Sequence, residues 1–111
     1  MEDSRLMQSM LLDFYGDLLT EKQRECCSMY FNEDLSLSEI AEQRGISRQG
    51  VWDNIRHGEA AMRETEEKTG LIRRFEHTRS GLCELLEMAS ALPEKEGGML
   101  EKKIREIIDS L

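Results

Sequence analysis

Four polar side chains near the middle of the sequence could read the edges of DNA bases. Arg48 and Arg56 carry guanidinium groups, which suit guanine, and Gln49 carries an amide, which suits adenine. Asp53 lies between them and would share their face of a helix. The ordinary alternative is a solvated helix surface with no binding role, and the residue types alone leave that alternative open.

An apolar stripe in the same segment predicts which side chains face outward. Val51 and Ile55 repeat four residues apart, as apolar positions do on the inner face of an amphipathic helix. A helix-turn-helix protein would place the first turns of this helix in the major groove, with Arg63 and Arg44 on phosphates. Trp52 lies beside the stripe, and we interpret it as a core or dimer-interface residue rather than a stacking platform.

The stretch 36–57 has the residue types of two short helices joined by a tight turn. Ser36 and Glu39 have the spacing of a capping box, which predicts a helix that begins one residue after Ser36. Gly45 occupies the position where a chain leaving a helix adopts a left-handed backbone. Ser47 is a second cap candidate, at the start of the helix with the outward polar set. This spacing is typical of a helix-turn-helix.

Two more helices are predicted before this motif. Residues 3–19 carry apolar side chains three and four apart, which indicates an amphipathic helix. Thr20 and Gln23 form another capping box, and the helix that follows should end before Asn32. Four helices in the first 58 residues, with short connections, predict a compact all-α domain, which we assign to residues 1–69.

A heptad seam follows in residues 70–111, which we assign to a helical arm and docking helix. Its apolar or small positions are separated by alternating steps of four and three: Leu71, Phe75, Thr78, Leu82, Leu85, Ala89 and Leu92. One interpretation is that the seam packs back onto the first helices. The interpretation we favour is a homodimer, because a small helical domain with a seam-bearing arm has more apolar surface than its own core covers. The predicted dimer interface is Leu71, Phe75, Leu82, Leu85 and Leu92.

The ends of the arm are marked by glycine and proline. Lys68 and Gly70 indicate a helix end or a kink, and Pro93 should end the seam helix. The stretch Glu94–Gly98 is predicted to be a loop because it holds two glycines. A last docking helix is expected from residue 100 onward.

The charge argues against strong intrinsic affinity for DNA. The net charge is -8, and residues 1–46 hold 4 basic and 10 acidic side chains, whereas residues 47–69 hold 4 and 5. Double-stranded DNA is itself a dense row of negative charge. The polarity of the predicted second helix would therefore permit nucleic-acid contact on one face without demanding it.

Other function classes find little support in the sequence. No nucleophile with a partnered base, phosphate-cradling glycine loop or paired catalytic carboxylate is visible, so we expect no enzyme and no cofactor. His57 and His77 lack a second ligand at helical spacing, so we expect no metal. No apolar stretch approaches the length of a membrane span, and we expect a cytoplasmic protein with three free thiols.

Several motifs resemble a known family. The run from residue 18 to residue 64 resembles the promoter-reading fourth region of bacterial primary sigma factors in its order of helices. More closely, LLDFYGDLLTEKQR, EDLSLSEIAE and SRQGVWDNIR resemble the YlxM family, small bacterial proteins usually encoded beside the signal recognition particle GTPase. The resemblance covers roughly residues 6–80. Gly50 and Trp52 depart from the alanine and the tyrosine or histidine more common in the family, and Gly58 adds a flexible point.

The resemblance implies a fold and a cellular role. The fold is a sigma-like helix-turn-helix unit of four helices followed by the helical arm. The role is a non-enzymatic regulator or adaptor of the signal recognition particle pathway, with the particle's GTPase or its RNA as possible partners. The alternative is the sequence-specific DNA-binding transcriptional regulator, with double-stranded DNA as its partner. A dimeric scaffold without nucleic-acid contact is a third interpretation.

Overall fold

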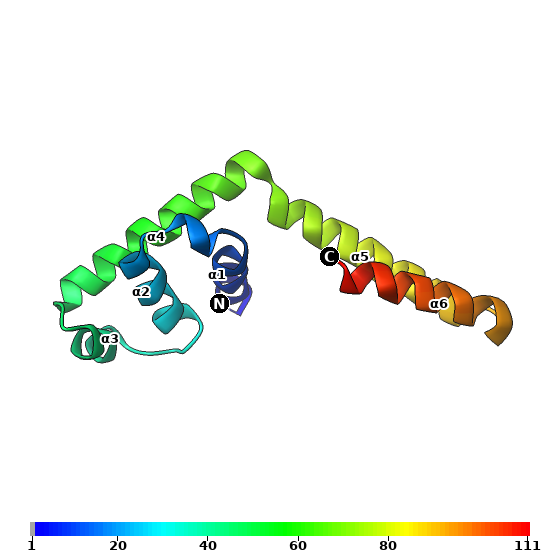
Figure 1. The fold of residues 1–111 in the computed structure, drawn as a ribbon, viewed down its shortest axis with the longest axis horizontal. Coiled ribbons are helices and arrows are strands. Elements are labelled where there is room, and N and C mark those ends of the chain that lie inside the picture. Colours follow the sequence, from blue (N-terminus) through cyan, green and yellow to red (C-terminus); the bar gives the residue numbers. More distant parts are fainter. Residues whose placement is uncertain (1) are drawn as a thin grey trace. The chain divides into compact units, whose positions relative to one another are not determined.

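The computed structural model describes residues 2–111, with side chains from Arg5 onward, and all regular elements in that range are helical (Figure 1). This confirms the predicted all-α class. The elements are α1 (Glu2–Tyr15), the 3-10 turn η1 (Gly16–Leu18), α2 (Glu21–Phe31), α3 (Leu37–Arg44), α4 (Arg48–Thr69), α5 (Leu71–Ser90) and α6 (Glu94–Asp109).

The chain divides into two compact units, Met1–Ile72 and Arg73–Leu111. The division falls inside α5, whereas the sequence placed it next to Gly70. The division of function between residues 1–69 and 70–111 stays a prediction.

Local sequence sets most helix ends in the first unit. Both predicted capping boxes form: the Thr20 hydroxyl accepts from the backbone N–H of Gln23 at 3.2 Å, and the Ser36 hydroxyl accepts from that of Glu39 at 3.1 Å. Gly45 has a φ of 67° and ends α3, because a side chain would be strained in this left-handed backbone.

The first helix is shorter than we predicted. The pattern indicated a helix over residues 3–19, but α1 ends at Tyr15 and the chain tightens into η1. Gly16 is buried, and a Cβ built on it would lie 3.7 Å from the Arg24 side chain. Glycine also disfavours a helix interior, so the change of geometry begins at this residue.

The first unit has one apolar core, to which all four of its α-helices contribute. In Figure 1, α1, α2 and α3 lie on one side of α4, and α4 contacts each of them. The core residues are Leu11, Tyr15, Cys26, Cys27, Met29, Phe31, Ile40, Val51, Ile55, Met62 and Ile72. Gly58 is part of this packing, since a Cβ on it would lie 2.9 Å from Cys27 Sγ. We therefore correct its interpretation as a flexible point: it lies inside an unbroken α4, where α2 approaches closely.

The second unit is a pair of helices. After the turn at Pro93, α6 runs back beside α5 (Figure 1). The predicted loop Glu94–Gly98 is wrong, because α6 already begins at Glu94. The physical reason is packing: Gly97 is buried, and a Cβ on it would lie 2.5 Å from the backbone oxygen of Ala89.

Candidate nucleic-acid interface

The turn between α3 and α4 fixes the start of α4 against the core. Ser47 caps α4, and its hydroxyl accepts a 2.9 Å hydrogen bond from the backbone N–H of Gly50. Ile40, Val51 and Ile55 are buried, as the apolar stripe predicted, and Ile46 is half-buried at the corner. The first two turns of α4 are therefore held in a defined orientation.

The predicted polar set lies on the outer side of these turns. Arg48, Gln49 and Arg56 are exposed, and Asp53 is half-buried. The amide nitrogen of Gln49 donates a 3.0 Å hydrogen bond to Asp53 Oδ1. The amide that could read adenine is therefore engaged by a carboxylate of its own helix, and that carboxylate places negative charge among the two arginines.

The basic side chains of residues 5–72 differ in whether they have acidic partners. Five of them form ion pairs, namely Arg5–Asp34, Arg24–Asp17, Arg44–Glu25, Arg63–Glu59 and Lys68–Glu64. Among the described residues of this unit, Lys22, Arg48 and Arg56 have none. Two of these three lie on the first turns of α4, where positive charge is left available for a ligand.

The two arginines that we expected on phosphates are engaged within the chain. Arg63 Nε donates to Glu59 at 3.2 Å, and Glu59 also accepts a 2.9 Å hydrogen bond from Gln8. Arg44 lies 3.1 Å from Glu25 and donates to the sulfur of Met29. Their charge is partly neutralised on the protein side, which weakens the expected phosphate role.

Trp52 is not a core residue, which corrects the first of our two interpretations of it. Its side chain is 37% exposed beside the buried stripe. An open hollow of about 620 Å³ lies between Trp52, Tyr30, Leu37, Arg48 and Gln49. A second hollow, of about 290 Å³, is lined by Trp52, Phe31, Ile55, Arg56, Glu59, Ala60 and Arg63. An aromatic ring with an arginine on each side is thus accessible to a ligand.

Tyr30 and Leu37 are the neighbours of this surface that the sequence did not indicate. Tyr30 is half-buried on α2, and its ring lies 5.5 Å from that of Phe31. Leu37 is the first residue of α3. The adjacent aromatic residues Tyr30 and Phe31 were the only signal in the sequence. The position of Tyr30 beside α4 depends on how α2 packs, which the sequence pattern does not show.

The predicted dimer residues fall into two groups. Leu71, Leu85 and Leu92 are exposed, whereas Phe75 and Leu82 are half-buried. These five residues do not form one uniform surface.

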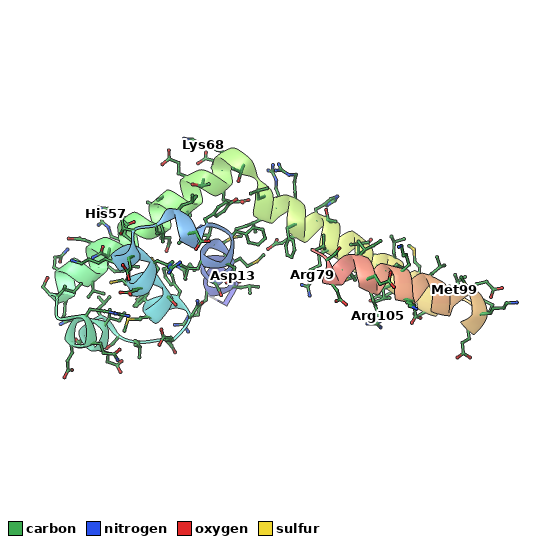
Figure 2. All side chains as sticks on the ribbon, viewed as in Figure 1. Asp13, His57, Lys68, Arg79, Met99 and Arg105 are labelled. Carbon is green, nitrogen blue, oxygen red and sulfur yellow. The ribbon has the colours of Figure 1, made fainter. Side chains whose placement is uncertain are left out.

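Metal and thiol chemistry have little basis in the described residues. No group of three or more His, Cys, Asp or Glu side chains could hold a metal ion there, and His57 is exposed on α4 (Figure 2). Cys26 and Cys27 are free and buried, and Cys83 is free and exposed. Burial, followed by Cys26 and Glu59, raises the pKa of the Cys27 thiol to about 12, so this thiol stays protonated. Among the described residues, no helix is long and apolar enough to cross a membrane.

Comparison of the sequence with known proteins places this chain in a family. Residues 2–106 match the model of the UPF0122 family, described as "Putative helix-turn-helix protein, YlxM / p13 like". The chain is 52% identical over 85 residues to a UPF0122 protein of Shouchella clausii, covering 77% of this chain and 78% of the relative. It is 42% identical over 110 residues to one of Acetivibrio thermocellus, covering 92% and 94%. It is 44% identical over 86 residues to YlxM of Bacillus subtilis, covering 78% of each. The chain belongs to the UPF0122 family of YlxM/p13-like helix-turn-helix proteins.

Proposed function

We propose that this protein is a non-enzymatic regulatory protein that binds nucleic acid through the first turns of α4. The observation that supports the proposal is the contrast in ion pairing: Arg48 and Arg56 are exposed without acidic partners, whereas five other basic side chains of the unit are paired. Unpaired guanidinium groups can neutralise phosphates or bond to bases. The proposed contacts are Arg48, Gln49 and Arg56 on the first turns of α4. Asp53 holds the amide of Gln49, and Arg63 lies further along α4 in its ion pair with Glu59, so these two residues border the proposed site.

RNA with unpaired bases fits this surface better than double-stranded DNA. Trp52 is 37% exposed and offers a ring on which an unstacked base can lie, and Arg48 and Arg56 each line a hollow beside it. Gln49 would have to leave Asp53 before it could read adenine in a major groove. An overall charge of -8 also opposes a long duplex more than a short single-stranded segment.

The RNA we propose is that of the signal recognition particle, and the cellular role is a cytoplasmic adaptor of that pathway. This part of the proposal rests on the likeness to the YlxM family described above. A sequence-specific regulator that binds double-stranded DNA is the alternative, and Arg48, Gln49 and Arg56 on the outer face of α4 favour it.

Gel shifts of the full chain across a salt series distinguish the RNA-binding proposal from the DNA-binding alternative. The probes are signal recognition particle RNA and a genomic DNA fragment of the same length, and the slope against salt gives the number of phosphates neutralised. We expect RNA binding that weakens in Trp52→Ala and Arg48→Ala. Lys22→Ala is the matched control, because it removes an unpaired basic charge from α2. Specific DNA binding that loses preference at one base position in Arg48→Ala would instead establish the regulator.

Binding of neither polymer at low salt would overturn the whole proposal. Equal losses in Lys22→Ala and Arg48→Ala would show that net charge, rather than the surface on α4, governs binding. Circular dichroism of each variant checks that the helices are retained.

A further inference from the structure

Positive charge gathers in the first half of α5. Residues 70–83 hold three arginines and one acidic side chain, whereas residues 84–111 hold 4 basic and 7 acidic side chains. The whole chain has a net charge of -8, so this stretch differs in sign from its surroundings. The first half of α5 is therefore a candidate surface for a negatively charged ligand.

Four side chains of this stretch line an open hollow of about 410 Å³, which we call the α5 hollow. They are Arg73, Arg74, His77 and Thr78. All four are exposed, and all four belong to the unit Arg73–Leu111. Arg73 lies four residues before His77, and Arg74 lies four before Thr78, so each pair is adjacent on successive turns of the helix. None of the four lining side chains is acidic.

Arg74 has no acidic neighbour on its own helix. Residues three and four positions apart are neighbours on a helix surface. At these distances from Arg74 the chain has Gly70, Leu71, His77 and Thr78. No ion pair joins Arg74 to another described residue. Arg79, in contrast, follows Glu76 by three residues. The positive charge of Arg74 is therefore available to a ligand.

The donors of the α5 hollow suit a phosphate group. His77 lies within four residues of both arginines of the hollow, and an imidazole carries at least one N–H in either protonation state. Thr78 adds a hydroxyl donor. Arginine and hydroxyl side chains are among the groups that bind phosphate oxygens at nucleic-acid interfaces, and the guanidinium bonds are charge-assisted.

We propose that the α5 hollow binds the sugar–phosphate backbone of the RNA that binds α4. This inference rests on the proposed function and adds a second contact to it, one that does not depend on base sequence. The first unit has little positive charge to spare for phosphates, because Arg44 and Arg63 are engaged by carboxylates. A chain with a net charge of -8 repels a polyanion, so concentrated positive charge on α5 raises its affinity for RNA.

Gel shifts of the full chain with signal recognition particle RNA at 50 and 200 mM salt test the inference. Arg74→Ala should raise the dissociation constant several-fold at 50 mM salt. One contact to a single-stranded backbone contributes about 0.7 to the salt slope, so this loss should shrink about 2.6-fold between 50 and 200 mM salt.

Arg79→Ala is the matched control for Arg74→Ala. It removes the same charge from an exposed position of the same helix, and Arg79 is labelled in Figure 2. Five residues turn an α-helix by about 140° beyond one full turn, so Arg79 lies on another side of α5. Arg79→Ala should keep the wild-type dissociation constant and salt slope, and circular dichroism checks that both variants retain their helices.

Trp52→Ala distinguishes this inference from the proposed function. RNA binding that weakens in Trp52→Ala but not in Arg74→Ala would refute the α5 contact and leave the α4 site in place. A loss in Arg74→Ala without one in Trp52→Ala would retain the α5 contact and refute the α4 site. Equal losses in Arg74→Ala and Arg79→Ala would refute the α5 contact, because net charge would explain both. A wild type that binds no RNA at low salt would overturn both.

A phospholipid headgroup offers the same phosphate chemistry, so sedimentation with vesicles distinguishes the two sources of phosphate. The vesicles contain equal parts of phosphatidylcholine and phosphatidylglycerol. We expect the wild type to remain in the supernatant at 50 mM salt. Pelleting that Arg74→Ala abolishes, together with an unchanged affinity of that variant for RNA, would overturn the inference and assign the α5 hollow to a membrane surface.

Discussion

The hydroxyl of Tyr15 donates a 2.6 Å hydrogen bond to Oε1 of Glu66, across 51 residues of sequence. The same carboxylate oxygen accepts a 2.9 Å hydrogen bond from the backbone N–H of Ile72, at the start of α5. The hydroxyl of Thr69 also lies 2.6 Å from that of Tyr15. One tyrosine on α1 therefore fixes the end of α4 and, through Glu66, satisfies a backbone donor of the next helix.

Removal of this hydroxyl should destabilise the first unit. Tyr15 is 3% exposed and Glu66 is half-buried, so Tyr15→Phe deletes a partly buried hydrogen bond to a charged group and should lower the free energy of unfolding by about 1–3 kcal/mol. Urea unfolding followed by circular dichroism measures this loss. Tyr30→Phe is the control, because its half-buried ring makes a contact with Phe31 that phenylalanine retains. Equal losses in the two variants would mean that the hydrogen bond to Glu66 adds nothing.

Stability should fall steeply at alkaline pH. Burial raises the pKa of the Cys27 thiol from 9.0 to about 12, and burial together with the hydrogen bond to Glu66 raises the pKa of Tyr15 above 10.0. A raised folded-state pKa means that the unfolded chain releases the proton first. The stabilisation is therefore complete below the unfolded pKa and is lost as pH rises through the folded pKa. For Cys27, whose window extends from its ordinary pKa of 9.0 to about 12, the slope approaches about 1.4 kcal/mol per pH unit.

The contribution of Cys27 can be isolated with reductant present. Between pH 9 and 10.5 the unfolding free energy of Cys27→Ala should fall less steeply than that of the wild type, each relative to its own value at pH 7. Cys83→Ala removes an exposed thiol instead and should retain the wild-type slope. A Cys27→Ala slope as steep as that of the wild type would contradict the raised pKa.

Two adjacent glycines of α6 should respond oppositely to alanine. A Cβ on Gly97 would lie 2.5 Å from the backbone oxygen of Ala89, so Gly97→Ala must push the two helices apart and should lower stability by about 1–3 kcal/mol. A Cβ on Gly98 meets nothing within 4 Å, so Gly98→Ala should raise helix stability by up to about 1 kcal/mol. Thermal unfolding measures the stability change in both variants. A change of the same sign in Gly97→Ala and Gly98→Ala would rule out the close contact between Gly97 and Ala89.

The glycines of this chain show which parts of the fold could be predicted from the sequence. The caps at Ser36 and Thr20 and the helix end at Gly45 depend on residues three or four apart, and they form as predicted. Gly97 was interpreted as a loop residue and Gly58 as a flexible point because local propensity was the only guide. Both lie where another helix approaches closely, which depends on contacts between residues distant in sequence.

The candidate interface was also only partly predictable from the sequence. The outward orientation of Arg48 and Arg56 follows from the period of the buried stripe. The engagement of Arg63 by Glu59, and of Gln49 by Asp53, depends on which rotamers the neighbours select, and helical spacing only permits it. Exposure of Trp52 depends on how α2 and α3 pack beside α4, so sequence adjacency to the buried stripe was misleading.

Asp53 should weaken nucleic-acid binding, and its removal should strengthen it. Its carboxylate lies among the proposed contacts and holds the amide of Gln49 at 3.0 Å. Asp53→Asn removes a negative charge beside the ligand and should lower the dissociation constant about threefold or more at low salt, the size expected for one charge at several ångströms in water. Glu67→Gln is the matched control, because it removes the same charge from an exposed position about 20 Å further along α4, beyond the screening length. Gel shifts at 50 and 200 mM salt measure the dissociation constants of both variants. An equal gain in Glu67→Gln, or no gain in Asp53→Asn, would show that the ligand does not contact the first turns of α4.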